Sequence, residues 1–273
     1  MPVSTTAHLT AALHFIVGVQ PRSVLDVGCG FGTWGFLCRE HLDVFNGRVW
    51  PKDWEIRIDA IEFFEPYIMA HQRALYNDIR IGDIREASLD CGHYDLIIAG
   101  DVIEHLDKKD AEDVLDRLYL LSDKALLVNI PLGPGWIHPE QYGNPAEEHR
   151  SAWEPWEFAP YAPEFVQFPL PCGDYGCFFC KAGLSERERV DGYLHLAGEW
   201  ETHGDLAAAE RALNRAVAFA PGSEEVALSL ADFLLRQGRV RDALPALART
   251  VHANPGAATV AAMHTKLYEA VKR

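Results

Sequence analysis

The sequence predicts an α/β fold with a mostly parallel sheet, followed by a small all-α domain. Three observations support this prediction. Between residues 22 and 132, short β-branched runs alternate with helical patterns, as in a series of βαβ units. A glycine-rich turn, GCGFG, follows the first run. Beyond residue 185 the composition changes to Ala, Leu, Glu and Arg at helical spacing. We therefore expect two domains, residues 1–184 and 185–273, which suits a chain of 273 residues.

The elements of the first domain can be predicted in order. A helix is expected to begin near residues 4–6 and to include the apolar stretch Leu9–Val19. Two strands at Phe165–Phe168 and Cys177–Ala182 flank the turn-forming segment PCGDYG. Residues 131–173 are rich in Pro, Gly and aromatic residues, which predicts an ordered loop. Before that loop, five strands are expected within SVLDVG, RIDAIE, IRIGD, YDLIIAGD and ALLVNIP. The sheet would then have seven strands between helical layers.

The second domain shows an internal repeat. A shift of 34 residues aligns AGEWETHGDLAAAERALNRAVAFAPG with ADFLLRQGRVRDALPALARTVHANPG, placing Gly204 on Gly238 and Pro221 on Pro255. The period and the small residues in phase resemble tetratricopeptide repeats. An ordinary helical bundle is the alternative. Two repeats form a groove too short for extended peptides, so we expect them to form a homodimer interface or to cover the first domain.

Charge and composition argue against several classes of function. Lys and Arg number 25 against 40 Asp and Glu, and a net charge of −15 opposes binding to a phosphate backbone. A nucleic-acid substrate is therefore not expected. The stretch Leu9–Val19 is too short to span a bilayer, and no Lys or Arg precedes it as in a signal peptide. The six cysteines are scattered, unlike those of a secreted disulfide scaffold, so we expect a cytoplasmic location without membrane association.

The segment VLDVGCGFGTWG, residues 24–35, carries the strongest functional signal. A buried strand leads into Gly28, Gly30 and Gly32, which let a ligand approach the backbone where the next helix begins. Asp26 lies two positions before the first glycine. This pattern resembles the first motif of class I S-adenosylmethionine-dependent methyltransferases, whose fold is a Rossmann-like sandwich. The resemblance implies that the glycine loop packs beside the methionine moiety and the sugar, and that Asp26 orders the site.

Three further acids lie at successive strand ends, which share one edge of a parallel sheet. The resemblance implies that Glu62 accepts hydrogen bonds from both ribose hydroxyls. It implies that Asp83 meets the adenine amino group, that the N–H of Ile84 meets the ring, and that Asp101 lies near the methyl and the methionine amine. The expected cofactor is S-adenosylmethionine, with S-adenosylhomocysteine as product. NAD is the competing cofactor, but the loop lacks the final glycine spacing of GxGxxG. Each acid taken alone also suits a helix N-cap.

Glu104, His105 and His149 are the candidate catalytic residues, in DVIEHL and HRSAW. The resemblance implies that both segments border the substrate pocket. A histidine there is suited to remove a proton from a hydroxyl or amine during transfer. For an acidic nucleophile, positioning alone would suffice. The alternative is that Glu104 and His105 cap and orient a helix. Five aromatic residues of the following loop are expected to tie it down or to form an apolar wall of the pocket: Trp136, Trp153, Trp156, Phe158 and Tyr161.

The same segments also suggest a metal site. Asp101, Glu104, His105 and His149 resemble the acidic-x-x-Glu-His pattern, with a distant His, of methyltransferases that modify the 2′-hydroxyl at small-RNA 3′ ends. In those enzymes a divalent metal binds the reacting hydroxyls. This sequence departs from the pattern, because its first acid is Asp where that family has Glu, and its charge opposes RNA. A divalent metal therefore remains an alternative to a metal-free site.

The expected activity is transfer of a methyl group from S-adenosylmethionine to an oxygen or nitrogen of a small molecule, such as a sugar or secondary metabolite. Two alternatives remain. One is a metal-assisted 2′-O-methyltransferase related to the small-RNA enzymes. The other is a non-catalytic scaffold with a vestigial cofactor site, against which the full set of cofactor acids argues.

Overall fold

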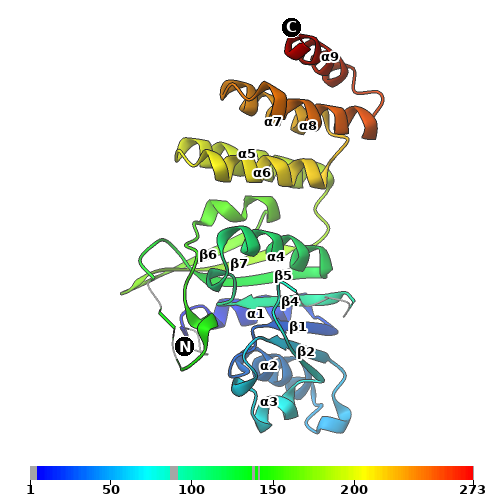
Figure 1. Ribbon diagram of the computed structural model, residues 1–273. Coiled ribbons are helices and arrows are strands. Elements are labelled where there is room, and N and C mark those ends of the chain that lie inside the picture. Colours follow the sequence, from blue (N-terminus) through cyan, green and yellow to red (C-terminus); the bar gives the residue numbers. More distant parts are fainter. Residues whose placement is uncertain (1–4, 87–91, 137–138, 141, 273) are drawn as a thin grey trace. The chain divides into compact units, whose positions relative to one another are not determined.

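The computed structural model describes residues 5–86, 92–136, 139–140 and 142–272, and the chain divides into two compact units. The first unit ends at Pro155 and resumes for Pro163–Gly183. The second unit combines Trp156–Ala162 with Leu184–Arg273. The segment 156–162 therefore packs with the C-terminal helices, although the sequence indicated a loop of the first domain. Figure 1 shows the elements of both units.

The first unit is built on one mixed sheet. Its strands are β1 (Ser23–Val27), β2 (Arg57–Glu62), β3 (Asp78–Ile81), β4 (Tyr94–Gly100), β5 (Ser122–Pro131), β6 (Glu164–Leu170) and β7 (Gly173–Lys181). Within the described residues the seven strands follow the order β3-β2-β1-β4-β5-β7-β6. The first five are parallel, and β7 is antiparallel to both β5 and β6. The predicted α/β fold with a mostly parallel sheet is confirmed. The strand order changes direction between β1 and β4, which is where such sheets bind ligands.

Helices cover both faces of this sheet (Figure 1). They are α1 (Leu9–Val19), α2 (Thr33–Cys38), α3 (Ala70–Leu75) and α4 (Lys108–Leu121). Residues of α1 and α2 pack on one face, where Ile16 and Trp34 join a core with alternate strand residues such as Val24 and Leu96. The helix α4 packs against β4 and β5, and its Leu115 and Leu118 are buried. Because β1, β4 and β5 are covered on both faces, their β-branched runs are buried almost throughout.

Two boundaries differ from the prediction. The helix α1 begins at Leu9, and the residue before it is a buried histidine, His8, whose side chain makes no cap hydrogen bond. Thr5 and Thr6 resemble N-caps in sequence but do not start the helix, and residue 4, the other candidate, lies outside the described residues. The turn between β6 and β7 is also shorter than PCGDYG, because pairing already begins at Leu170 and Gly173.

The second unit is all-helical, as predicted. Its helices are α5 (Glu186–Thr202), α6 (Leu206–Phe219), α7 (Glu224–Arg236), α8 (Val240–Ala253) and α9 (Ala258–Lys272). Gly204 and Gly238, which the repeat placed in phase, both adopt left-handed backbone conformations between paired helices, with φ of +81° and +72°. Ala209 and Ala243, also in phase, are fully buried. The 34-residue shift therefore relates equivalent structural positions.

The segment Trp156–Ala162 packs on the first helices of the second unit. The ring of Trp156 stacks on His203 and meets Trp200 edge to face, with centroids 5.1 and 4.7 Å apart. Tyr161 accepts a hydrogen bond from Arg215 Nη2 at 3.0 Å. Gly192 of α5 permits a close backbone approach, because a Cβ there would lie 2.6 Å from the carbonyl oxygen of Ala159.

Among the described residues, none of the helices has the length and apolar composition of a membrane-spanning segment.

Candidate functional site

A cavity of about 300 Å³ lies at the C-terminal ends of β1, β2 and β4. The structure brings seven predicted site residues to its wall: Gly28, Gly30, Glu62, Asp83, Ile84, Asp101 and His105. The other predicted site residues, Asp26, Gly32, Glu104 and His149, do not line it. Several lining residues carried no local signal in the sequence, among them Thr5, Thr6, Tyr67, Asn144, Glu147 and Arg150.

The glycine loop lies against the wall of this cavity. Gly28 has a φ of +70°, and a Cβ there would lie 2.5 Å from Val102 Cγ2, so a side chain is excluded by conformation and by space. The N–H of Gly30 donates to Glu62 Oε2 at 2.9 Å. Gly32 has a φ of +87° and lies immediately before α2. Its role is to turn the chain into the helix, since it does not reach the cavity.

Glu62 ends β2 and is 6% exposed. One carboxylate oxygen accepts from Gly30 N, and the other accepts from Phe64 N at 2.8 Å. Burial raises the pKa of Glu62, which the backbone hydrogen bonds partly counteract. A carboxylate offers about four acceptor positions, so Glu62 retains capacity to accept two hydroxyl donors from a ligand.

Asp26 faces away from the cavity. It is fully buried, and Oδ2 accepts a hydrogen bond of 2.5 Å from the hydroxyl of Tyr76, which in turn accepts from Gly35 N at 3.1 Å. Burial raises the pKa of Asp26 to about 7 despite the hydrogen bond from Tyr76. Asp26 thus joins β1 to α2 and to the residue that follows α3, directly behind the glycine loop. This arrangement suits the predicted role of ordering the site.

Asp83 and Ile84 follow β3 at the edge of the cavity. The carboxylate of Asp83 accepts from Arg85 Nη2 at 2.6 Å and from the backbone N–H of Arg85 at 2.9 Å. The hydrogen bond from Arg85 lowers the pKa of Asp83. Arg85 also pairs with Asp110 at 3.3 Å, so its charge is shared between two carboxylates. No local motif marks Arg85, because its partner Asp110 lies 25 positions later, in α4.

Asp101 follows β4 with a backbone φ of +53°, an uncommon conformation for a residue with a side chain. Its N–H donates to the carbonyl of Asn129 on β5 at 2.9 Å. Its Oδ1 accepts from the hydroxyl of Tyr175 on β7 at 2.8 Å. Hydrogen bonds to β5 and β7 therefore hold the backbone and the carboxylate of Asp101 in place.

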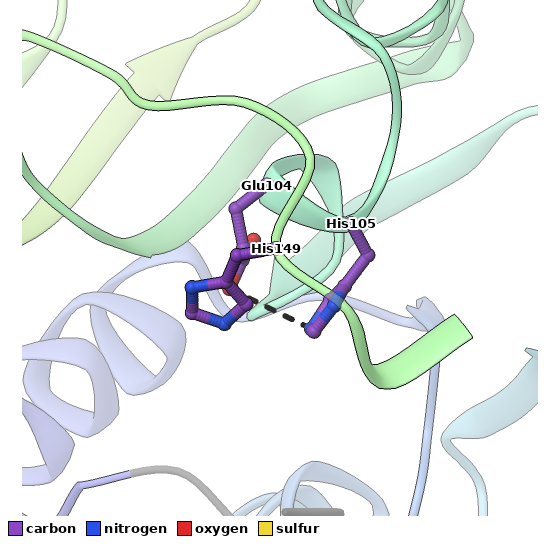
Figure 2. A group of neighbouring side chains, drawn as sticks. All are labelled: Glu104, His105 and His149. Carbon is purple, nitrogen blue, oxygen red and sulfur yellow. Dashed lines mark ion pairs between the residues drawn. The ribbon is translucent and has the colours of Figure 1, made fainter. Parts of the chain in front are cut away.

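Glu104, His105 and His149 form a cluster (Figure 2), and His105 lines the cavity. One ligand atom from each residue lies within 4.8 Å of the others. Glu104 is 1% exposed, and among the described residues neither of its carboxylate oxygens has a hydrogen-bond donor. Burial and the charge of Asp101 raise the pKa of Glu104 well above its usual range. Its Oε1 lies 3.9 Å from His105 Nε2, along the dashed line of Figure 2.

Backbone carbonyls orient both histidine rings. His105 Nδ1 lies 3.1 Å from the carbonyl oxygen of Glu148, and His149 Nδ1 lies 3.1 Å from that of Trp136. A carbonyl oxygen can only accept, so these contacts assign the proton of each neutral ring to Nδ1 and the lone pair to Nε2. The two rings meet edge to face with centroids 4.9 Å apart. Neither Glu104 nor His105 supplies the N-cap of α4, which is Asp107.

A hydrogen bond crosses the cavity between two loops. The hydroxyl of Tyr67, after β2, donates to Glu147 Oε1, after β5, at 2.8 Å. Burial and the adjacent carboxylate raise the pKa of Tyr67 to about 12, although a hydrogen bond with Asn144 lowers it. Gln72 Nε2 donates to the carbonyls of both Gly30 and Tyr67, at 2.8 and 2.7 Å. The glycine loop is thus connected through Tyr67 to the loop that precedes His149.

The five aromatic residues of the predicted loop do not line the cavity. Trp136 donates through Nε1 to the carbonyl of Asp174, and Trp153 is 2% exposed with Lys108 Nζ 3.6 Å from its ring centroid. The remaining three belong to the segment that packs in the second unit. These contacts support the interpretation that the aromatic residues fix the chain. An apolar wall for the acceptor stays a prediction.

Two family models match the sequence. One is described as a methyltransferase domain and matches residues 6–169, and the other is described as a tetratricopeptide repeat and matches residues 202–267. No curated protein matches the chain.

Solved structures of similar fold include the methyltransferase domain of a bacterial Hen1 protein, with 18% identity and a TM-score of 0.44 over 65% of this chain and 98% of that one. TehB from Haemophilus influenzae has 15% identity and a TM-score of 0.47 over 66% of this chain and 64% of that one. The N-methyltransferase NodS from Bradyrhizobium japonicum has 15% identity and a TM-score of 0.45 over 67% of this chain and 100% of that one.

Proposed function

Since the chain belongs to the methyltransferase domain family and carries a tetratricopeptide repeat, we propose that it methylates an oxygen or nitrogen of a small molecule bound beside Glu104, His105 and His149. The enzyme class and the cofactor, S-adenosylmethionine, are those of the family. The acceptor and the residues that act on it are the proposal.

The cavity residues fit the cofactor. Glu62 retains acceptor positions for a ribose diol, and the absence of a side chain at Gly28 leaves its backbone open to the ligand. Asp83 and Ile84 would hold the adenine, and Asp101 the cationic end. When bound, S-adenosylmethionine supplies a methyl group on a sulfonium, which makes direct displacement by an acceptor lone pair feasible. The protein's contribution is to align the acceptor and to limit water.

His105 is the residue best placed to accept a proton from the acceptor. It lines the same cavity as Asp101, and its tautomer leaves the lone pair on Nε2. Glu104 Oε1 lies 3.9 Å from that nitrogen, so the charge of the resulting imidazolium would favour the ionised form of Glu104, which would stabilise it as an ion pair. The single observation that carries the proposal is this buried carboxylate with no donor among the described residues, beside two oriented imidazoles.

The charge around the cluster favours a neutral or cationic acceptor. Asp101 and Glu147 line the cavity near His105, while Arg150 is paired with Asp107 at 3.3 Å. With a net charge of −15 for the chain, a phosphate-rich substrate would be repelled at long range.

The experiment is to measure S-adenosylhomocysteine formation with a panel of sugars, phenols and amines, using wild type and His105→Asn. The variant should bind S-adenosylhomocysteine as wild type does but transfer methyl about 10²–10⁴-fold more slowly, the usual contribution of a general base. His93→Asn is the control, because His93 is exposed and pairs with Asp123 away from the cavity. An unchanged rate in His105→Asn would contradict the assignment.

A second candidate, a metal-assisted methyltransferase, is favoured by the same cluster. Ligating histidines usually donate the other ring N–H to a carbonyl or carboxylate, as His105 and His149 do here. Glu104 then supplies a carboxylate that the described protein groups leave without a donor. One carboxylate and two imidazoles suit a divalent transition metal. Such an ion would hold an acceptor hydroxyl and lower its pKa, which extends the proposal to vicinal diols such as a ribose 2′-hydroxyl.

This second candidate is tested by titrating Mn²⁺ and Zn²⁺ into chelator-treated protein by calorimetry. One ion should bind per chain, and His149→Ala should weaken binding at least about 10-fold, as for loss of a ligand or its support. His93→Asn should bind as wild type does. If neither ion binds and a chelator changes neither activity nor thermal stability, the metal-free form of the proposal stands.

A further inference from the structure

Asp101 has a conformation that its surroundings must maintain. Its φ of +53° lies in the left-handed region, which glycine adopts readily and other residues adopt at a cost in free energy. Such strain is kept where neighbouring groups over-determine the backbone, and it often coincides with ligand sites. Asp101 lines the cavity at the end of β4, next to Gly28 and His105 in the same wall.

Two strands hold Asp101 from one side. The carbonyl of Asn129 on β5 accepts from its N–H at 2.9 Å, which fixes the backbone. The hydroxyl of Tyr175 on β7 donates to Oδ1 at 2.8 Å, which fixes the carboxylate. Tyr175 is 1% exposed and does not line the cavity, so it acts on Asp101 and not on a ligand. A hydrogen bond to an ionised carboxylate is among the stronger kinds in proteins.

The ring of Tyr175 is itself fixed by two aromatic neighbours. His8 stacks on it with centroids 4.7 Å apart and planes at 27°, and Trp136 meets it at 6.2 Å and 64°. Burial lowers the pKa of His8 to about 4, so this ring is neutral at physiological pH. His8 precedes α1, and its neighbours Thr6 and Leu9 line the cavity. Tyr175 therefore connects the N-terminal segment of the chain to the carboxylate of Asp101.

We propose that Tyr175 is a positioning residue, which holds the Asp101 carboxylate where it binds the cationic amino-acid end of S-adenosylmethionine. The inference rests on the proposed cofactor role of Asp101. The phenol donates to Oδ1 and so restricts the orientation of the carboxylate. The antiparallel strand β7 thereby takes part in cofactor selection without touching the cofactor.

The test uses Tyr175→Phe, which keeps the ring and its stacking and removes only the hydroxyl. Calorimetry compares two probes, S-adenosylhomocysteine and 5′-methylthioadenosine, which lacks the amino-acid tail. The variant should bind S-adenosylhomocysteine about 10-fold more weakly, the scale of one hydrogen bond to a charged group. Its affinity for 5′-methylthioadenosine should stay within about twofold of wild type, because the adenosine contacts are unchanged.

Tyr119→Phe is the matched control. Tyr119 is also buried, and its hydroxyl donates to the carbonyl of Lys181, at the far end of β7, at 2.9 Å. This variant loses a tyrosine hydroxyl from α4, which packs on the same sheet, and should bind both probes as wild type does. In an Asp101→Ala background, Tyr175→Phe should have no further effect on either affinity, since the carboxylate it positions is absent.

Each outcome decides a different point. Equal weakening of both probes in Tyr175→Phe, or weakening of neither, overturns the positioning role. If Asp101→Ala removes the preference of wild type for S-adenosylhomocysteine but Tyr175→Phe does not, the cofactor role of Asp101 stands and that of Tyr175 fails. If wild type itself shows no preference between the probes, the cofactor role of Asp101 fails, and the inference fails with it.

Discussion

Glu62 is the side chain whose loss should affect the cofactor site most. Its two oxygens already accept the backbone N–H groups of Gly30 and Phe64, which orients them. Glu62→Ala removes two expected charged hydrogen bonds to ribose, so the affinity for S-adenosylhomocysteine should fall at least about 100-fold in calorimetry. Glu164→Ala, an exposed acid of β6, should have no effect. Equal affinities for Glu62→Ala and wild type would refute the ribose assignment.

Asp26 should make the folded state sensitive to pH. Its pKa in the folded protein is about 7, above the ordinary 3.8, so between these values the folded state holds a proton that the unfolded state has released. Stability from this group is therefore greatest at low pH and is lost as the pH rises from about 4 to 7, by roughly 2–4 kcal/mol. Asp26→Asn has no carboxyl group at this position, so it lacks this pH-dependent change in stability. Urea unfolding at pH 5 and pH 8 should show wild type losing more stability than the variant. An equal or opposite change would contradict the assignment.

At the residue scale, the sequence predicted those site residues that stand in a short motif or at the end of their own strand. Gly28 and Glu62 could be found because the glycine turn and the strand-end acid are adjacent to their own strands. Tyr67 and Tyr175 could not, because their partners lie 80 and 74 positions away in sequence and no short motif marks such a pair. The orientation of Asp26 also escaped prediction, since the Tyr76 hydroxyl that faces it comes from a loop 50 positions later.

At the scale of elements, the strands were predictable because their apolar runs are buried on both faces. The start of α1 was not. Residues 4–6 carry Ser and Thr, which suit an N-cap, but Leu9 begins the helix because His8 stacks against Tyr175 of a distant strand. Tertiary packing here outweighs the local capping preference.

Two glycines of α5 give a matched prediction about helix packing. Gly192→Ala would place its Cβ 2.6 Å from backbone atoms of Ala159 and Pro160, which cannot move as a side chain end can. It should destabilise the protein by about 1–3 kcal/mol. Gly198→Ala has nothing within 4 Å of the new Cβ, so it should stabilise by up to about 1 kcal/mol through helix propensity. Denaturant unfolding of both variants measures this, and equal effects would contradict the packing described.

At the scale of the whole molecule, the segment 156–162 was assigned to the wrong unit from sequence. Its Trp, Phe and Tyr follow the segment that carries His149, so the sequence predicted that they tie that loop down or form an apolar wall of the pocket. Their partners are Trp200, His203 and Arg215, which only the folded repeats bring together. Contiguity in sequence therefore gave no guide to which unit buries these rings.

A chain ending at residue 183 lacks the helices on which this segment packs, so it should expose the apolar side chains of the segment. Phe158 and Tyr161 are 0% and 1% exposed in the full chain. The shortened chain should bind an apolar fluorescent dye strongly and melt several degrees lower, as for a loss of about 1–2 kcal/mol. Full-length protein is the control. Unchanged dye binding and melting would show that the segment needs no helical partner.

A homodimer formed by the repeats stays a prediction. The mass of one chain is 30.5 kDa, so sedimentation equilibrium of the full-length protein should give about twice that value. A measured mass of one chain at micromolar concentration would contradict the homodimer.

The central claim is that Gly28, Glu62 and Asp83 surround one adenosyl ligand. A crystal structure of the protein with S-adenosylhomocysteine tests it most directly. The account predicts the ribose hydroxyls within hydrogen-bond distance of the Glu62 carboxylate, the adenine beside Asp83 and Ile84, and the amino group beside Asp101. A ligand bound elsewhere on the chain, or seated in the cavity with its ribose away from Glu62, would contradict it.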